Sequence, residues 1–243
     1  MLLAMKLYNY FRSSASFRVR IALNLKGLPF EYIPVHLAKG EHKLPGYTAI
    51  SADGLVPLLD DGEQVLSQSM AIIEYLDETH PEPPLLPRDA LGRARVRALA
   101  QSIACEIHPL NNLRVLKYLT GPLGLDEDTK NTWYRHWVRE GLESFERQLA
   151  QGPKSTYCFG DQPTLADCCL VPQIFNAKRF DTPLEGLPRT MAVLPGWSPF
   201  TSVRTVRRAP SRQSRASRVP GVSAPKARRA STSIFMRSRC RLP

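Results

Sequence analysis

The sequence lacks long hydrophobic runs. No apolar stretch among the 243 residues reaches the roughly 18–20 residues that a membrane-spanning helix needs, so we expect no membrane association. The opening segment MLLAM is too short for a signal peptide and has no charged region followed by a long apolar core. Cysteine is scarce, and the five cysteines form neither a CxxC pair nor a metal-ligand spacing. This pattern favours reduced thiols in a cytoplasmic protein and no bound metal.

Acidic residues are absent from the last 50 residues of the chain. Residues 194–243 contain 11 Arg, one Lys and no Asp or Glu, whereas residues 1–193 contain 21 basic and 22 acidic residues. The net charge of +11 therefore arises in this terminal segment, and residues 1–193 carry a net charge of −1. This distribution argues against nucleic acid as a partner of the main part of the chain.

The terminal segment, residues 194–243, is rich in Ser, Arg, Pro and Ala and has almost no apolar periodicity. We expect it to be disordered, since it cannot bury enough surface to offset its ordering entropy. A basic tail of this kind can bind nucleic acid or acidic membranes through phosphate contacts. However, the composition changes abruptly at about Val193, where a helix would be expected to continue. We therefore favour a reading-frame shift near the end of the coding sequence over a binding tail.

The first 80 residues alternate between strand and helix signals. The predicted order is a strand at 5–11, a helix at 14–26, a strand at 30–37, a hairpin at 55–67 and a helix at 69–80. Gly27 stops the first helix, and Pro34 argues that the second strand lies at an edge or ends there. Ser69 is predicted to cap the last helix, which ends before Pro81.

A proline-rich segment, PEPPLLP at residues 81–87, forms a stiff linker and marks the natural domain boundary. The pattern beyond it is helical over 89–118, with a bend or interruption near Pro109, then over 127–150 and 164–180. Asp167 occupies the third helical position after Thr164, as the acid of a capping box does. We therefore expect Asp167 to be structural and not catalytic.

Five motifs occur in an order that resembles the zeta class of cytosolic glutathione transferases. SSASFRVRIAL at residues 13–23 is similar to the signature Ser-Ser-Cys-x-x-Arg-Val-Arg-Ile-Ala-Leu of that class, and the segments LVPLL, QSMAIIEYLDE, IHPLNNLRVLKYL and TLADCCLVPQIFNAKRF are similar to its later motifs. The resemblance runs from about Met5 to Met191. It departs at Ala15, where the family has a cysteine, so the reacting thiol must come from glutathione.

The resemblance implies an α/β domain followed by an all-α domain. A thioredoxin-like, glutathione-binding domain would occupy residues 1–83 and a helical substrate domain residues 84–193, with the basic segment at 194–243. The resemblance also implies that the protein is cytoplasmic, forms a homodimer and uses glutathione as its cofactor.

Ser13 and Ser14 stand at the start of the helix that follows the first strand. One interpretation is that they cap the helix by satisfying its free backbone donors. The other is that a helix N-terminus with spare hydroxyls holds an anion. The resemblance implies the second: Ser13 would hydrogen-bond the glutathione sulfur and promote its ionisation, and Ser14 would share this role or cap the helix.

Four further positions would bind glutathione if the resemblance holds. A cis peptide bond before Pro57 would turn the backbone of Val56 towards the cysteinyl unit, Gln68 and Ser69 would bind the γ-glutamyl carboxylate, and His42 would contact the glycyl end. Each feature also has a structural alternative: a proline at a strand start, a simple N-cap and a solvated loop histidine.

The helical half supplies the remaining candidates. His108 and Asn112 are one helical turn apart on one face and could hydrogen-bond glutathione or substrate, although a buried, satisfied histidine is an equal alternative. Arg12 and Arg179 are candidates for binding substrate carboxylates, because guanidinium groups pair with them bidentately. Arg18 and Arg20 lie on the helix body, and we expect them to be surface or interface charges.

A dicarboxylate with a cis double bond fits these residues. Addition of the glutathione thiolate would allow rotation about the resulting single bond, and its expulsion would leave the trans product. The resemblance implies isomerisation of 4-maleylacetoacetate to 4-fumarylacetoacetate in tyrosine and phenylalanine breakdown. Maleylpyruvate isomerisation and a general transferase or dehalogenase activity on small α-halo acids stay open. A binding module with a nucleic-acid-binding tail is the non-enzymatic alternative, but the retained serine, Val-Pro, Gln-Ser and Arg motifs argue against it.

Overall fold

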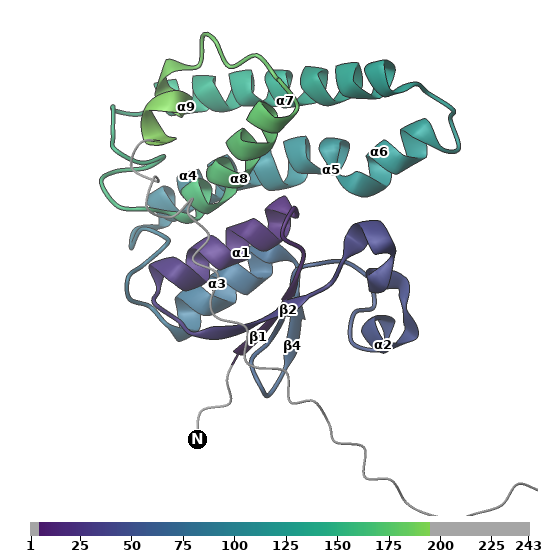
Figure 1. Ribbon diagram of the computed structural model, residues 1–243. Coiled ribbons are helices and arrows are strands. Elements are labelled where there is room, and N and C mark those ends of the chain that lie inside the picture. Colours follow the sequence, from purple (N-terminus) through teal and green to yellow (C-terminus); the bar gives the residue numbers. More distant parts are fainter. Residues whose placement is uncertain (1–4, 195–243) are drawn as a thin grey trace, which may run out of the picture. The chain divides into compact units, whose positions relative to one another are not determined.

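The first half of the chain is built on a four-stranded sheet (Figure 1). The computed structural model describes residues 5–194, and the predictions for residues 195–243 lie outside this range. The strands are β1 (Met5–Asn9), β2 (Phe30–Pro34), β3 (Leu58–Asp60) and β4 (Val65–Ser67), in the order β2-β1-β3-β4. β1 pairs with β2 in parallel and with β3 antiparallel, and β3 and β4 form the predicted hairpin.

The strands lie where they were predicted, but the first two end earlier. β2 is an edge strand, as its proline indicates, and ends at Pro34, three residues before the predicted end. β1 ends at Asn9, two residues earlier than predicted, because its pairing with β2 stops opposite Pro34. The chain then turns, and the backbone N–H of Ser13 donates to the carbonyl oxygen of Tyr10 at 2.9 Å.

The helices of the first half are α1 (Ser14–Leu25), α2 (Pro45–Thr48) and α3 (Ser69–Thr79), with two short 3-10 turns, η1 (Leu37–Lys39) and η2 (Glu41–Lys43). The prediction that Ser69 caps α3 is wrong by one position. Gln68 is the N-cap, with a left-handed backbone (φ 67°, ψ 115°), and Ser69 is the first helical residue.

The second half consists of helices α4 (Ala90–Gln101), α5 (His108–Asn111), α6 (Leu113–Thr120), α7 (Glu127–Ala150), α8 (Leu165–Arg179) and α9 (Pro188–Val193), with a π-helical segment, η3 (Ser102–Ile107), between α4 and α5. None of the helices within residues 5–194 has both the length and the apolarity that crossing a membrane requires. The predicted capping box of Thr164 and Asp167 is present at the start of α8, which confirms the structural role of Asp167.

The single helix predicted over residues 89–118 is interrupted twice. The π-helical segment η3 ends just before Pro109, which has no backbone N–H to donate within a helix. The second break is at Asn112, whose backbone is extended (φ −77°, ψ 160°). Its side-chain oxygen accepts hydrogen bonds from the backbone N–H groups of Arg114 and Val115, so Asn112 starts α6 as an N-cap.

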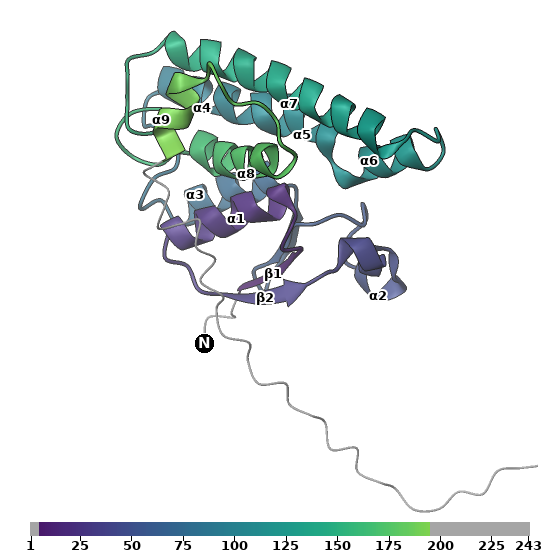
Figure 2. The same ribbon diagram turned by 45° about the horizontal axis from the view of Figure 1, so that its top comes forward.

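Helices α1 and α3 lie between the sheet and the helices of the second half in both views (Figures 1 and 2). One contiguous core therefore runs through both halves, from Leu7 and Ile21 to Val96 and Leu170. This arrangement corrects the prediction for two arginines. Arg18 and Arg20 are not surface charges: only 2% and 7% of them is exposed, because α1 packs against both α3 and α8.

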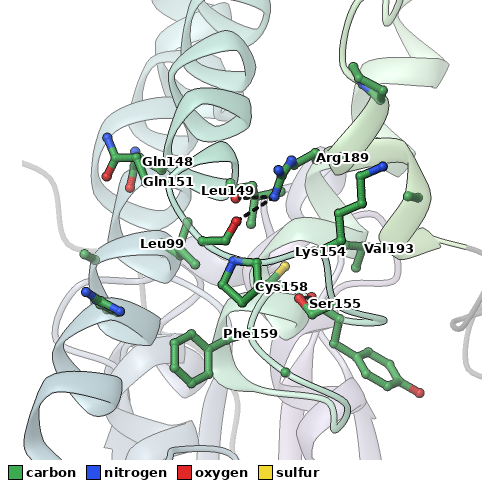
Figure 3. A pocket seen from close by; sticks show the side chains of 18 residues that line it. Leu99, Gln148, Leu149, Gln151, Lys154, Ser155, Cys158, Phe159, Arg189 and Val193 are labelled. Carbon is green, nitrogen blue, oxygen red and sulfur yellow. Dashed lines mark hydrogen bonds between the residues drawn. The ribbon is translucent and has the colours of Figure 1, made fainter.

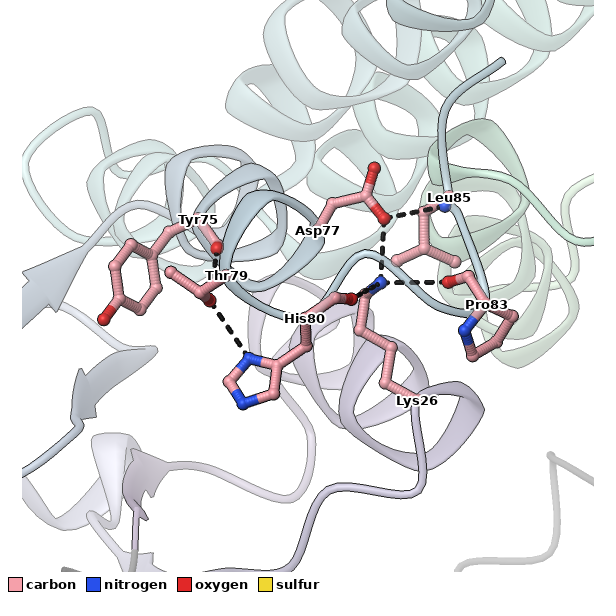
Figure 4. Close-up of polar contacts among 7 residues, drawn as sticks. All are labelled: Lys26, Tyr75, Asp77, Thr79, His80, Pro83 and Leu85. Atoms are coloured by element: carbon pink, nitrogen blue, oxygen red, sulfur yellow. Dashed lines mark hydrogen bonds and ion pairs between the residues drawn. The ribbon is translucent and has the colours of Figure 1, made fainter. Parts of the chain in front are cut away.

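Lys26 fixes the proline-rich linker to the first half (Figure 4). Its ammonium group pairs with Asp77 at 2.8 Å and donates to the carbonyl oxygens of His80 at 2.7 Å and Pro83 at 2.9 Å. The Asp77 oxygen also accepts the backbone N–H of Leu85 at 2.8 Å. Since the Lys26 side chain has no exposed surface, these bonds replace all of its hydration.

We predict that Lys26→Met lowers the free energy of unfolding by about 3 kcal/mol, because it leaves the Asp77 carboxylate buried with one partner fewer. Urea denaturation of the purified protein measures this change. Lys6→Met is the matched control, since the pair of Lys6 with Asp60 is at the surface and should contribute nothing measurable. Equal losses in the two variants would contradict the assignment.

Candidate active site

The start of α1 presents two free backbone donors and a serine hydroxyl. Ser13 is the N-cap, and its side-chain oxygen accepts the backbone N–H of Ser16 at 3.2 Å. The N–H groups of Ser14 and Ala15 make no hydrogen bond within the described residues. The Ser13 oxygen is used as an acceptor, so its own hydrogen is available to a ligand. Ser13 thus caps the helix and can also contribute to an anion site.

Ser14 joins the two halves of the chain. Only 6% of it is exposed, and its hydroxyl oxygen accepts a hydrogen bond from the side-chain amide of Asn176 in α8. No sequence pattern pointed to Asn176. The contact ties the first turn of α1 to the last turns of α8, where Arg179 is the final residue.

The start of α3 is a second group of free donors. The backbone N–H groups of Ser69 and Met70 make no hydrogen bond within the described part of the chain. The Ser69 hydroxyl oxygen accepts from the guanidinium of Arg18 at 3.3 Å. The left-handed backbone of Gln68 directly precedes this turn, and such a conformation is costly for a residue other than glycine. Strain of this kind is typical of functional sites.

The loop before β3 leaves backbone groups unused. The peptide bond between Val56 and Pro57 is cis, as the resemblance implies. Among residues 5–194, no group bonds to the backbone N–H or carbonyl oxygen of Val56. The preceding carbonyl, that of Leu55, is held by the Tyr47 hydroxyl at 2.5 Å. A ligand with an extended backbone can therefore pair with Val56.

Two histidines of the site have buried ring nitrogens without partners. The Nδ1 atoms of His42, in η2, and His108, at the start of α5, make no hydrogen bond. Burial lowers the pKa of His42, and the charges of Lys43 and Lys117 lower it further. Burial lowers the pKa of His108 to about 3, with smaller contributions from two arginines, Arg18 and Arg114. Both rings are therefore neutral near pH 7 and can accept or donate one hydrogen bond.

Asn112 does not continue the helical face of His108. It follows α5 with an extended backbone, and its amide also donates to the carbonyl oxygen of Pro109 at 3.0 Å. Since its side-chain oxygen caps α6, only one amide hydrogen is left for a ligand. The expectation that the two residues share one face of one helix is wrong for this reason.

Arg12 and Arg179 are two exposed cations at the ends of the elements that Ser14 and Asn176 connect. Partial desolvation lowers the pKa of Arg179, and the positive charge of Arg12 lowers it further. Neither makes an ion pair within the described residues. Arg179 lies over the ring of Phe180, 5.2 Å from its centroid, and Phe180 stacks on Tyr134 with 3.9 Å between centroids. A ligand with two carboxylates would neutralise this pair.

A cavity of about 810 Å³ lies elsewhere, between α4, α7 and α9 (Figure 3). Leu99, Phe159 and Val193 are among its lining residues, and no candidate site residue is. The guanidinium of Arg189 in its wall donates hydrogen bonds to the carbonyl oxygens of Leu149 and Gly152, at 3.1 and 2.8 Å. Burial raises the pKa of the Cys158 thiol in its wall, so this thiol is not a reactive nucleophile.

Comparisons with known proteins agree with the geometry. The family models described as glutathione S-transferase, N-terminal domain, and glutathione S-transferase, C-terminal domain, match residues 3–78 and 138–201. A maleylpyruvate isomerase of Ralstonia is 54% identical over 190 residues, which cover 78% of this chain and 90% of the relative. A maleylacetoacetate isomerase of Pseudomonas aeruginosa is 49% identical over 194 residues, covering 78% and 89%.

Solved structures give the same result. The holo structure of a maleyl pyruvate isomerase, described as a bacterial zeta-class glutathione S-transferase, has a TM-score of 0.77 and 53% identity and covers 79% of this chain and 91% of its own. A maleylacetoacetate isomerase of Anaeromyxobacter dehalogenans with bound GSH in the active site has a TM-score of 0.72 and 41% identity, covering 82% and 93%.

Proposed function

Because the chain belongs to the zeta class of the glutathione S-transferase family, we propose that it catalyses the glutathione-dependent cis–trans isomerisation of a maleyl dicarboxylate. The fold of this family, a thioredoxin-like domain followed by a helical domain, is the one predicted from the sequence. The observation that carries the proposal is that Arg12 and Arg179, each without an acidic partner among the described residues, suit two carboxylates. We also propose that the boundary between the two domains lies between residues 83 and 84.

The chain's unused polar groups fit glutathione. The backbone of Val56 suits the cysteinyl unit, and the free N–H groups and hydroxyl of Ser69, with Gln68, suit the γ-glutamyl carboxylate. His42, with its unpartnered Nδ1, suits the glycyl end. When bound, glutathione supplies a thiolate that adds to the maleyl double bond and leaves again after rotation.

The start of α1 would keep that sulfur ionised. The free thiol has a pKa of about 8.5, and a helix N-terminus together with a hydroxyl donor lowers this value. Both hydroxyls accept a hydrogen bond and keep a hydrogen to donate, but Ser13 is partly exposed, whereas Ser14 is buried against Asn176. Ala15 has no thiol to replace glutathione.

Arg12 and Arg179 would bind the substrate carboxylates and stabilise the negative charge that develops during the reaction. His108 is neutral and has a free ring nitrogen, so it suits a hydrogen bond to glutathione or substrate and not an ion pair. Asn112 could add the one amide hydrogen that its capping role leaves.

We propose maleylacetoacetate as the substrate. Maleylpyruvate is the second candidate, because a relative with 54% identity is named for it. The assay of both compounds with and without glutathione tests the function. Turnover that needs glutathione supports it, and no turnover of either compound would overturn it in favour of a general transferase, a dehalogenase or a binding module.

A cytoplasmic homodimer is also part of the proposal. The four cysteines of the described part, Cys105, Cys158, Cys168 and Cys169, are free thiols, as expected in a reducing compartment. Light scattering after size exclusion measures the assembly directly, and a mass of one chain would contradict the dimer.

Ser13→Ala is predicted to reduce isomerase turnover by at least tenfold, because it removes the hydroxyl that stabilises the thiolate. Ser14→Ala should have a smaller effect, since that hydroxyl is bound to Asn176. Steady-state kinetics at saturating glutathione measure both. Equal or reversed losses would assign the thiolate contact to Ser14.

Arg179→Ala is predicted to raise the KM for the maleyl dicarboxylate at least tenfold and to change the KM for glutathione much less. The reason is that Arg179 is assigned to a substrate carboxylate, whereas the groups assigned to glutathione lie at the starts of α1 and α3 and in the loop before β3. Lys178 is the exposed residue next to Arg179, so Lys178→Ala is the matched control and should change neither constant. A larger loss of affinity for glutathione would place Arg179 in the cofactor site.

A further inference from the structure

Each arginine assigned to a substrate carboxylate lies over the aromatic ring of its neighbour in the chain. The guanidinium carbon of Arg179 is 5.2 Å from the centroid of the Phe180 ring, and that of Arg12 is 5.9 Å from the centroid of the Phe11 ring. Both distances are within the roughly 6 Å over which a cation and a ring face attract each other. Since neither arginine has an acidic partner among the described residues, the rings are the groups that can orient them.

The Phe180 ring is fixed by its surroundings. It stacks on the ring of Tyr134 in α7, with 3.9 Å between centroids and 20° between planes, and only 1% of Tyr134 is exposed. The backbone of Phe180 is held as well: its N–H donates to the carbonyl oxygen of Asn176 at 3.1 Å, and its own carbonyl oxygen accepts from Arg135 at 2.8 Å. The ring therefore has a defined position at the end of α8, directly beside Arg179.

Phe11 gives Arg12 a weaker support. Phe11 is 61% exposed, and its ring meets those of Tyr10 and His36 edge-on, with 4.8 and 6.2 Å between centroids. Water covers much of such a ring, and a cation over an exposed ring is held less strongly than one over a desolvated ring. Of the two contacts, the fold therefore supports the one between Phe180 and Arg179 more firmly.

A ring holds a guanidinium without neutralising it. The negative face of the ring attracts the cation, but the ring carries no net charge. The N–H donors of the guanidinium stay available, because the ring face takes up none of the directions in which they point. An acidic partner would instead occupy two donors and cancel the charge. Support by a ring therefore suits an arginine that has to bind an incoming carboxylate.

We propose that Phe180 is a positioning residue for the isomerisation: its ring, fixed against Tyr134, orients the guanidinium of Arg179 towards a substrate carboxylate and leaves its charge and its donors to that carboxylate. The inference rests on the proposed function, because it assumes a dicarboxylate substrate. Phe180 acts through Arg179, and the proposal assigns it no contact with the reacting atoms.

The test changes the charge of the ring face and hardly changes its shape. Phe180 is replaced in the full chain by 4-fluoro-, 3,5-difluoro- and 3,4,5-trifluorophenylalanine, which weaken the negative face in steps. The KM for the maleyl compound that the wild type converts should rise with each step, by about threefold to tenfold at the last. The KM for glutathione and the unfolding temperature should stay as in the wild type. Steady-state kinetics and thermal unfolding measure these quantities.

A double-mutant cycle tests whether Phe180 acts through Arg179. Phe180→Leu removes the ring face and should raise the KM for the maleyl compound about fivefold, whereas Phe180→Tyr keeps the ring and should retain the wild-type KM. In the Arg179→Met background, Phe180→Leu should cause no further rise, because there is no guanidinium left to orient. Should Phe180→Leu fail to fold, the fluorinated series decides alone.

Phe175→Leu is the matched control on the same helix. Phe175 is 60% exposed and meets the ring of Phe17 edge-on at 6.4 Å, and no guanidinium lies over it among the described residues. Its replacement should leave both KM values unchanged.

The outcomes are distinct. A KM for the maleyl compound that does not change along the fluorinated series would overturn the role of Phe180 while leaving the proposed function intact. A rise on Phe180→Leu that is equally large in the Arg179→Met background would do the same, since the effect would then be structural. A wild type that converts neither maleyl compound would overturn the proposed function, and the inference with it.

Discussion

The hydrogen bond from the buried guanidinium of Arg18 to the Ser69 hydroxyl connects the middle of α1 to the start of α3. The free N–H groups of both helix starts and the exposed guanidinium groups of Arg12 and Arg179 add further positive charge, with no acidic partner among the described residues. A fold that maximised its own stability would pair or remove the buried charge of Arg18. The presence of these charges makes sense for a site whose ligands, a tripeptide and a dicarboxylate, bring the negative charge with them.

The proposed site draws its residues from both halves of the chain. The sheet places the start of α1 after β1 and the start of α3 after β4, while the helical half contributes His108 and Arg179. The contact of Ser14 with Asn176 and the contiguous core hold these parts together. Lys26 adds a second attachment at the linker, where its ammonium group replaces water for three oxygen atoms. The site geometry therefore depends on packing between the halves as much as on either half.

Local sequence patterns predicted most of the helices and strands, but they did not reveal residues whose roles depend on distant parts of the chain. The apolar period of α7 and the capping box of α8 are local signals, and both helices lie where they were predicted. Arg18 was misjudged because a helix sequence does not reveal that α3 and α8 both pack against α1. The break at Asn112 was missed for a related reason: an asparagine inside a helical pattern shows its capping role only once the chain turns there. Asn176 gave no signal, since its partner is 162 residues away.

The central claim is that uncompensated positive charge at the start of α1 keeps the bound thiol ionised. The most direct measurement is the ultraviolet absorbance of the thiolate in the glutathione complex as a function of pH. The account predicts a midpoint at least one unit below that of free glutathione, so that at least about half of the bound sulfur is ionised at pH 7.5, and a midpoint close to the free value in Ser13→Ala. A wild-type midpoint equal to that of free glutathione would contradict it.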